Sequence, residues 1–238
     1  MDKAAIKVLT IVGTRPEIIR LSRVMALLDE TLNHVVVHTG QNYDYELNEI
    51  FFKDLELREP DYFLKVDTSS LGKVLGETLI KIEEIFLKEK PDAVLILGDT
   101  NSSIAGIMAK RQKIPIYHME AGNRCFDFNV PEEINRRIID HIADFNLVYT
   151  EHARRHLLSE GLPHRRIYLT GSPMNEVLNY YKGKIEKSGI LDKLNLKSKD
   201  YFVVSTHREE NVDNQDILAK ILAVLHSLVS KYEKDVIV

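Results

Sequence analysis

Cysteine is nearly absent from this 238-residue chain, in which Cys125 stands alone. A single cysteine excludes an intrachain disulfide framework as well as multi-cysteine zinc and iron–sulfur sites, and it fits a reducing compartment. We therefore expect a cytoplasmic protein without a metal centre of that kind.

Membrane segments, a secretory signal and a strong net charge are also lacking. No window approaches ~18 uninterrupted apolar residues, and the polar first residues lead straight into a strand pattern instead of the apolar core of a signal peptide. The formal net charge of −4 gives no global attraction to nucleic acid or to an anionic membrane. We therefore expect neither as a partner, and an anionic ligand would require a local basic site.

The first two thirds of the chain alternate short apolar runs with longer amphipathic segments. Nearly all-apolar runs that alternate with helices predict a parallel sheet with helices on both faces. The pattern therefore indicates an α/β, Rossmann-like, doubly wound domain over residues 1–171. The predicted strands are 6–12, 34–39, 93–97, 114–119, 146–149 and 166–170, and the predicted helices are 16–30, 45–52, 71–88, 131–143 and 151–159, with one more ending near 111.

The remainder predicts a connector and the start of a second Rossmann-like unit. Residues 172–200 become lysine-rich and lack large apolar runs, whereas 201–205, 215–233 and 236–238 predict a strand, a helix and a strand. A β-α-β fragment of about 40 residues does not easily bury a core of its own. We therefore expect residues 201–238 to be an incomplete nucleotide-binding domain.

Polar clusters follow several predicted strands, at the sheet edge where open α/β folds bind ligands. The loop at 13–17 is not GxGxxG, so NAD binding loses its main support. Arg15, at a helix N-terminus, could contact phosphate, or it could be a surface arginine beside a capped helix start.

Carboxylates recur at these strand ends. Asp99 follows a buried strand and could be a general base, a metal ligand or an N-cap for the next helix. Glu120 follows another strand directly, and Glu132 lies in the first turn of a predicted helix, four residues before Arg136. Helix-dipole and surface pairing explain one such acid but not all three. Carboxylates gathered at one cleft indicate acid–base chemistry.

His207 lies at the corresponding strand end of the second unit. A lone histidine can be structural or catalytic, and both readings stay open from its position. Such a residue is more often structural, and its place at an expected interdomain cleft makes a role in the site equally plausible.

Taken in order, seven motifs resemble those of the non-hydrolysing UDP-N-acetylglucosamine 2-epimerase family. The match spans essentially the whole chain, and so many motifs in one order are specific although each alone is weak. The motifs are GTRPEIIR (13–20), TGQNYD (39–44), LGDTNS (97–102), HMEAGNR (118–124), PEEINRR (131–137), TGSPM (170–174) and THREEN (206–211).

The resemblance implies a two-domain GT-B-like fold that holds a UDP-amino sugar between two Rossmann-like domains. The family reaction removes the C2 proton and expels UDP to give a 2-acetamidoglucal, and UDP then adds back after reprotonation on the other face. It implies no cofactor, neither NAD nor a metal redox centre. We also expect a homodimer.

The motif match implies roles for individual residues. Asp99, Glu120 and Glu132 would be the acid–base carboxylates, and His207 would be catalytic or would contact the diphosphate. Arg20 stands where many members carry lysine, which keeps the charge but changes the donor geometry. The cationic or positioning contacts would be Arg15, Arg20 and Arg136.

Loop residues refine the expected substrate. Asn123 and Cys125 depart from the EAGLR-Thr pattern usual for UDP-N-acetylglucosamine, and they resemble the capsule and O-antigen branch that converts UDP-2-acetamido-2,6-dideoxy-L-talose to UDP-N-acetyl-L-fucosamine. The chain ends inside a predicted strand, so we expect little epimerase activity from these 238 residues alone. Two alternatives remain: a GT-B glycosyltransferase and a non-catalytic UDP-sugar-binding fragment.

Overall fold

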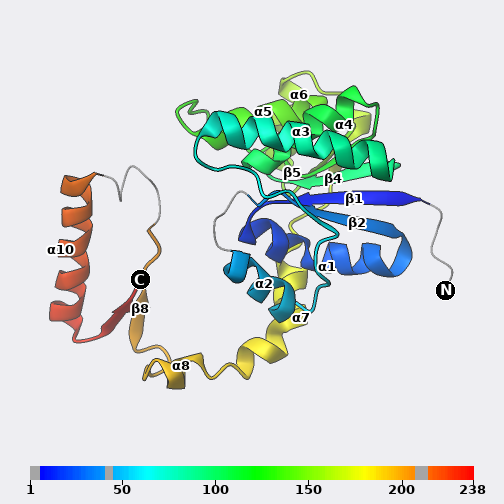
Figure 1. Cartoon of the computed structure of the whole chain (residues 1–238). Helices are drawn as coiled ribbons and strands as arrows, with labels where there is room; N and C mark the ends of the chain where they lie inside the picture. The colour runs from blue at the N-terminus through cyan, green and yellow to red at the C-terminus, as the bar shows by residue number, and fades with distance from the viewer. Residues whose placement is uncertain (1–5, 41–44, 207–213) are drawn as a thin grey trace. The chain divides into compact units, whose positions relative to one another are not determined.

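The apolar runs of the first part of the chain align in one seven-stranded parallel sheet (Figure 1). The computed structural model describes residues 6–40, 45–206 and 214–238, which divide into two compact units, Met1–Tyr181 and Lys182–Val238. The sheet lies in the first unit and has the order β3-β2-β1-β4-β5-β6-β7. Its strands are β1 (Lys7–Val12), β2 (Asn33–His38), β3 (Tyr62–Phe63), β4 (Ala93–Leu97), β5 (Ile116–Ala121), β6 (Phe145–Val148) and β7 (Ile167–Leu169).

Helices cover both faces of this sheet, with α3, α4 and α5 on one side and α1 and α2 on the other (Figure 1). A short 3-10 turn, η1, leads into α4. The helical elements of the first unit are α1 (Arg15–Thr31), α2 (Tyr45–Asp54), α3 (Leu71–Glu89), η1 (Asn101–Ile104), α4 (Ala105–Arg111), α5 (Pro131–Ile142), α6 (Glu151–Ser159) and η2 (His164–Arg166), and α7 (Met174–Glu186) begins there.

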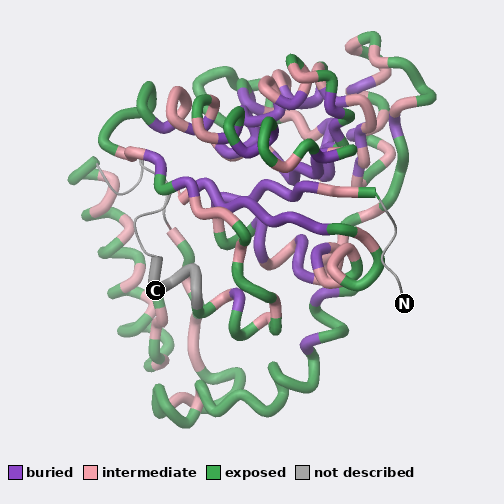
Figure 2. Tube along the Cα trace, turned by 45° about the vertical axis from the view of Figure 1, so that its right-hand side comes forward, coloured by how far each residue is buried: buried purple, intermediate pink, exposed green. Residues whose placement is uncertain are grey.

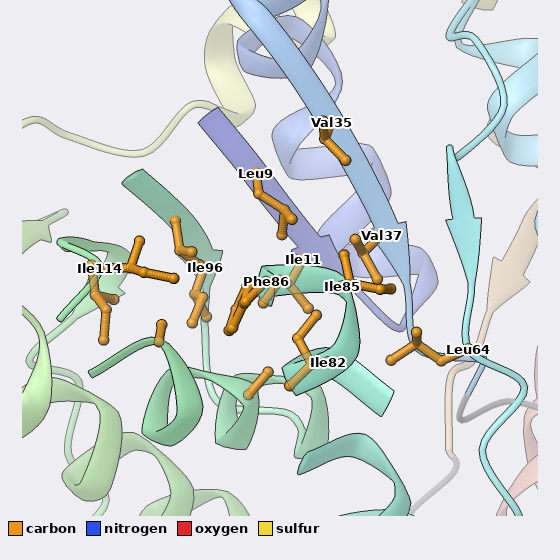
Figure 3. Packing of buried hydrophobic residues seen from close by; sticks show 14 of the residues in the cluster. Leu9, Ile11, Val35, Val37, Leu64, Ile82, Ile85, Phe86, Ile96 and Ile114 are labelled. Atoms are coloured by element: carbon orange, nitrogen blue, oxygen red, sulfur yellow. The ribbon is translucent and has the colours of Figure 1, made fainter. Parts of the chain in front are cut away.

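Alternate residues of each central strand enter two separate cores, as the two-residue repeat of a strand requires. In β1, Leu9 and Ile11 pack with Phe86 of α3, whereas Val12 packs with Leu21 of α1 on the opposite face. Figure 3 shows the first of these cores, and Figure 2 shows that the strands are the most continuously buried part of the chain. The predicted Rossmann-like, doubly wound class is therefore confirmed.

The strand order places a topological switch point between β1 and β4. Successive strands extend from β1 through β2 to β3 on one side and from β4 through β5 and β6 to β7 on the other. At such a point the connections leave in opposite directions and open a crevice at the carboxyl ends of the strands. A ligand site is therefore expected at the loops after β1 and β4.

The second unit contains a parallel pair, β8 (Tyr201–Val203) and β9 (Asp235–Ile237), joined by α10 (Gln215–Tyr232). No residue of α10 is buried, and Leu222, Val224 and Val229 are exposed. This is the expected strand, helix and strand order without a core of its own. The sequence-based domain limits stay predictions.

Two features differ from the sequence prediction. The range expected as a connector contains all of α7 and the short α8 (Ile190–Lys193). Only two side chains of α7 are buried, Val177 and Tyr181, so the helix carries a weak apolar pattern. β3 has two residues, too few to give a strand signal. In the part of the chain that the structure describes, no helix is long and apolar enough to cross a membrane.

We predict that Phe86→Ala destabilises the fold by roughly 3–5 kcal/mol, because Phe86 is 1% exposed and its removal leaves a cavity between α3 and the sheet. Its neighbour Leu87 is 62% exposed, so Leu87→Ala is the matched control and should change stability by less than about 0.5 kcal/mol. The chain has no tryptophan, so urea unfolding is followed by far-ultraviolet circular dichroism. Equal midpoints for the two variants would contradict this packing.

Candidate active site

A buried glutamate joins the two loops that flank the switch point. Glu17 is the third residue of α1, and its Oε2 accepts hydrogen bonds from the N–H groups of Gly13 and Thr14 at 2.5 and 2.8 Å. Its Oε1 accepts from the hydroxyls of Thr100 and Ser102 at 2.5 and 2.9 Å. Burial raises the pKa of Glu17, and these hydrogen bonds oppose that rise. The carboxylate therefore fastens the loop after β1 to the loop after β4.

Sequence reasoning did not assign Glu17 a role. The Thr-x-x-Glu spacing of residues 14–17 is a capping-box signal and could have identified its contact with the helix start. The contacts with Thr100 and Ser102 span more than 80 positions, and no local pattern predicts them.

Asp99 lies in the loop after β4 and does not cap the helical turn that follows. The Thr100 side chain caps η1 by accepting from the N–H of Ser102, so the N-cap explanation for Asp99 is wrong. The Asp99 carboxylate instead forms an ion pair with Arg136, whose Nη2 and Nε lie 2.7 and 2.8 Å from Oδ2. Burial raises the pKa of Asp99, Arg136 opposes the rise, and the negative charge of Glu132 adds to it.

Glu120 is placed at the end of β5 in a left-handed backbone conformation, with φ of 66°. The register between β5 and β6 shifts at this point, and the shift turns the side chain toward the strand-end loops. Its carboxylate pairs with Arg20 of α1 and accepts from the amide of Asn123 at 3.4 Å. Burial raises the pKa of Glu120, Arg20 opposes this, and the negative charge of Asp99 adds to it.

The first turns of α5 supply the remaining charges. Glu132 is exposed and close enough to act on the titration of Asp99. Arg136 points to Asp99 and to Glu133, at 3.3 Å, and not to Glu132 as the four-residue spacing predicted. Glu133 also forms an ion pair with Arg137, four residues further along α5, at 2.9 Å. Asp99 and Glu120 thus each face one arginine, with Glu132 beside them.

Tyr149 is a further candidate that sequence reasoning missed. It directly follows β6, and its hydroxyl is buried without a hydrogen-bond partner among the described residues. Burial raises the pKa of Tyr149, and the negative charge of Glu120 raises it further, while the positive charge of Arg20 opposes this rise. Tyr149 therefore places a neutral hydroxyl with unused hydrogen-bonding capacity beside Glu120.

Arg15 is the described residue among those predicted that these contacts do not bring into the cluster. Arg15 is exposed at the start of α1, with its guanidinium carbon 6.0 Å from the ring centre of Phe51. His207 lies outside the described residues, as do 208–211 of the same motif and 41–44 of the TGQNYD motif. Their roles stay predictions.

Across 6–40, 45–206 and 214–238, three or more histidine, cysteine or acidic side chains do not gather in a way that could hold a metal ion. The Asp99 and Glu120 carboxylates face arginines, which suits acid–base work beside an anionic ligand.

Comparison with known proteins decides the family. The profile of the UDP-N-acetylglucosamine 2-epimerase family matches residues 26–238. The chain belongs to this family. A UDP-N-acetylglucosamine 2-epimerase homolog from Methanococcus maripaludis is 44% identical over 219 residues, which are 91% of this chain and 61% of that protein.

Solved structures of the epimerase family agree. That of UDP-N-acetylglucosamine 2-epimerase from Rickettsia bellii is 52% identical, with a TM-score of 0.90 over 98% of this chain and 61% of the other. The Methanocaldococcus jannaschii enzyme in complex with UDP-GlcNAc and UDP is 38% identical, with a TM-score of 0.90 over 97% and 65%. MurG from Acinetobacter baumannii, at 12% identity and a TM-score of 0.50 over 70% and 45%, shares the fold alone. The chain thus spans about three fifths of the length of these epimerase relatives.

We predict that Glu17→Ala destabilises the first unit of this epimerase-family chain by roughly 2–4 kcal/mol, because it leaves the buried N–H groups of Gly13 and Thr14 without an acceptor. Glu17→Gln is the matched control. Its amide oxygen can accept from the same N–H groups while its NH2 donates to the hydroxyls of Thr100 and Ser102, so we expect a loss below about 1 kcal/mol.

Urea unfolding followed by circular dichroism measures both Glu17 variants. If alanine costs no more than glutamine, the carboxylate does not hold the two loops together.

Proposed function

We propose that the protein containing these residues is an isomerase that inverts C2 of a UDP-linked 2-acetamido sugar. The observation that carries the proposal is the pair Asp99 and Glu120, two carboxylates of raised pKa that each face an arginine at neighbouring strand ends. Membership of the epimerase family supports the same reaction. Because the chain spans three fifths of its relatives, the activity is proposed for the whole protein.

The chemistry requires a base and a stabilised leaving group. The C2 proton of the sugar is not adjacent to a carbonyl, so enolisation is not open to it. A carboxylate takes that proton, the C–H electron pair forms the C1=C2 double bond, and the C1–O bond breaks so that its electron pair leaves with UDP. Return of a proton to the opposite face and re-addition of UDP complete the inversion without a cofactor.

The described groups suit these steps. Burial raises the pKa of both Asp99 and Glu120, and a carboxyl group of raised pKa accepts and returns protons more readily than an ordinary one. Arg20 and Arg136 stabilise the ionised forms, and Arg15 at the start of α1 is the candidate for the diphosphate. His207 is proposed as a second group at the diphosphate.

Exchange of the C2 hydrogen with solvent deuterium tests the reaction. We expect the whole protein to incorporate deuterium at C2, and we expect Asp99→Asn, Glu120→Gln and Glu132→Gln each to lose roughly 10²–10⁴ in exchange rate. Glu83→Gln, on the exposed surface of α3, is the control and should exchange normally.

Three outcomes would reject the proposal. Sugar transfer to an acceptor without C2 exchange would indicate a glycosyltransferase. Binding of UDP-N-acetylglucosamine in calorimetry without turnover would indicate a sugar-binding protein. Full exchange in all three carboxylate variants would place the chemistry elsewhere.

Within this substrate class we propose the branch that acts on UDP-2-acetamido-2,6-dideoxy-L-talose and serves surface polysaccharides. Asn123, at a position where UDP-N-acetylglucosamine enzymes usually carry leucine, contacts Glu120 at 3.4 Å, so this departure lies beside the reacting carboxylates. Running the exchange assay on both sugars compares the two, and faster exchange with UDP-N-acetylglucosamine would favour the other branch.

We also propose that the protein works in the cytoplasm as a homodimer. Sedimentation velocity on the whole protein should give twice the mass of one chain, and a monomer at micromolar concentration would contradict this.

A further inference from the structure

One buried histidine contacts the turn of Asp99 directly and the turn of Glu120 through an aspartate. His118 lies in β5, and its side chain is fully buried. Its Nε2 is 2.8 Å from the carbonyl oxygen of Gly98, the residue before Asp99. Its Nδ1 is 2.9 Å from Oδ1 of Asp140, a fully buried carboxylate of α5. Nε2 makes a hydrogen bond with the carbonyl, whereas Nδ1 lies at ion-pair distance from the carboxylate without hydrogen-bond geometry, so both neighbours favour a positively charged ring.

Asp140 extends this contact to the other turn. Its carboxylate accepts from the N–H of Gly122, two residues after Glu120, at 3.1 and 3.2 Å. Its Oδ2 also accepts from Arg124 at 2.6 Å, and Arg124 in turn forms two hydrogen bonds with Glu160 at 2.6 and 2.8 Å. The histidine and its acid therefore lie between the turn of Asp99 and the turn of Glu120, behind the side chains that face the crevice.

Both turns have backbone that needs to be held. Gly98 and Gly122 have φ of 73° and 79°, and between them Glu120 adopts 66°, a conformation that is costly for a residue with a side chain. A Cβ atom on Gly122 would lie 2.4 Å from the carbonyl oxygen of Ala153, so this turn is packed tightly against α6. A fixed partner beneath the turns is therefore required to keep Glu120 in place.

We propose that His118, held as an imidazolium by Asp140, is the positioning residue of the site, fixing the turns of Asp99 and Glu120 relative to each other and placing one positive charge behind both. This rests on the proposed acid–base role of those two carboxylates. His118 itself touches no substrate.

The charges around the ring agree with this role. Burial lowers the pKa of His118, but the contact with Asp140, aided by the carbonyl of Gly98 and the charge of Asp99, outweighs burial and leaves the pKa above its ordinary value. The positive charge acts in return on Asp99 and Glu120, where it opposes the rise that burial causes in the pKa of each. Arg124 also faces Asp140 but is balanced by Glu160.

The unmodified chain gives the first test. With histidine labelled in both ring nitrogens, we expect the His118 resonances to show protonation of both nitrogens at neutral pH. A neutral His118 ring at neutral pH would overturn the proposal without any variant having to fold.

Two variants give the second test. In His118→Gln the amide can still donate to the Gly98 carbonyl but the positive charge is lost, so we expect the titration midpoints of Asp99 and Glu120, read from side-chain carboxyl carbon shifts, to rise by about one pH unit. Asp140→Asn should raise them by less, because His118 becomes neutral while the negative charge of Asp140 is removed as well.

His34→Gln is the matched control. His34 is another fully buried histidine, which bonds Thr10 at 2.8 Å and Asp29 at 2.7 Å, but it lies at the opposite end of the sheet from the carboxylates. The His34→Gln variant should lose a comparable amount of stability and leave the titration midpoints of Asp99 and Glu120 unchanged. If His118→Gln behaves like His34→Gln, His118 is only a core residue.

The titration readout is independent of turnover. If the midpoints of Asp99 and Glu120 rise in His118→Gln but the unmodified protein shows no C2 exchange, the positioning role stands and the proposed reaction is rejected. If the unmodified protein exchanges C2 but the midpoints stay unchanged in His118→Gln, the reaction stands and the positioning role is rejected.

Discussion

The parallel pairing of β1, β4 and β5 is the constraint on which the rest of the site depends. Thr10 opposes Leu95, and Ile96 opposes His118, so the three strands run in register and end at the same edge of the sheet. Loops separated by some hundred positions in sequence therefore meet in space. Glu17, Asp99 and Glu120 come together for this reason, because Glu17 and Asp99 follow β1 and β4 and Glu120 lies in the last two residues of β5.

The charged groups at this edge form an outer and an inner layer. Nearest the crevice, Arg20 and Arg136 face Glu120 and Asp99. Behind them, Glu17 holds one pair of loops through four accepted hydrogen bonds, and a buried histidine–aspartate pair holds another. A buried carboxylate is stable only when its oxygens are satisfied, so the inner layer fixes the backbone while the outer layer stays available to a ligand.

Local sequence patterns were sufficient for most of the first unit. Apolar runs located its long strands because both faces of the sheet are covered, and helical spacing located α1, α3, α5 and α6 within a few residues. β3 and α7 were missed, since a two-residue strand and a helix with two buried side chains carry almost no periodic signal. The motifs also named Asp99, Glu120, Arg20 and Arg136, which the structure brings to one edge.

The sequence by itself therefore determined the α/β class, the family and the candidate carboxylates, because those follow from periodicity and from residues that stand in order along the chain. Only the tertiary structure decided which side chains these residues contact. Spacing paired Arg136 with Glu132, whereas the fold turns it to Asp99. Spacing also gave no role to His118, and for Glu17 it indicated the helix start but not Thr100 or Ser102. Helical periodicity relates neighbours within one element, but hydrogen bonds across the switch point depend on the register of strands distant in sequence, which no local pattern encodes.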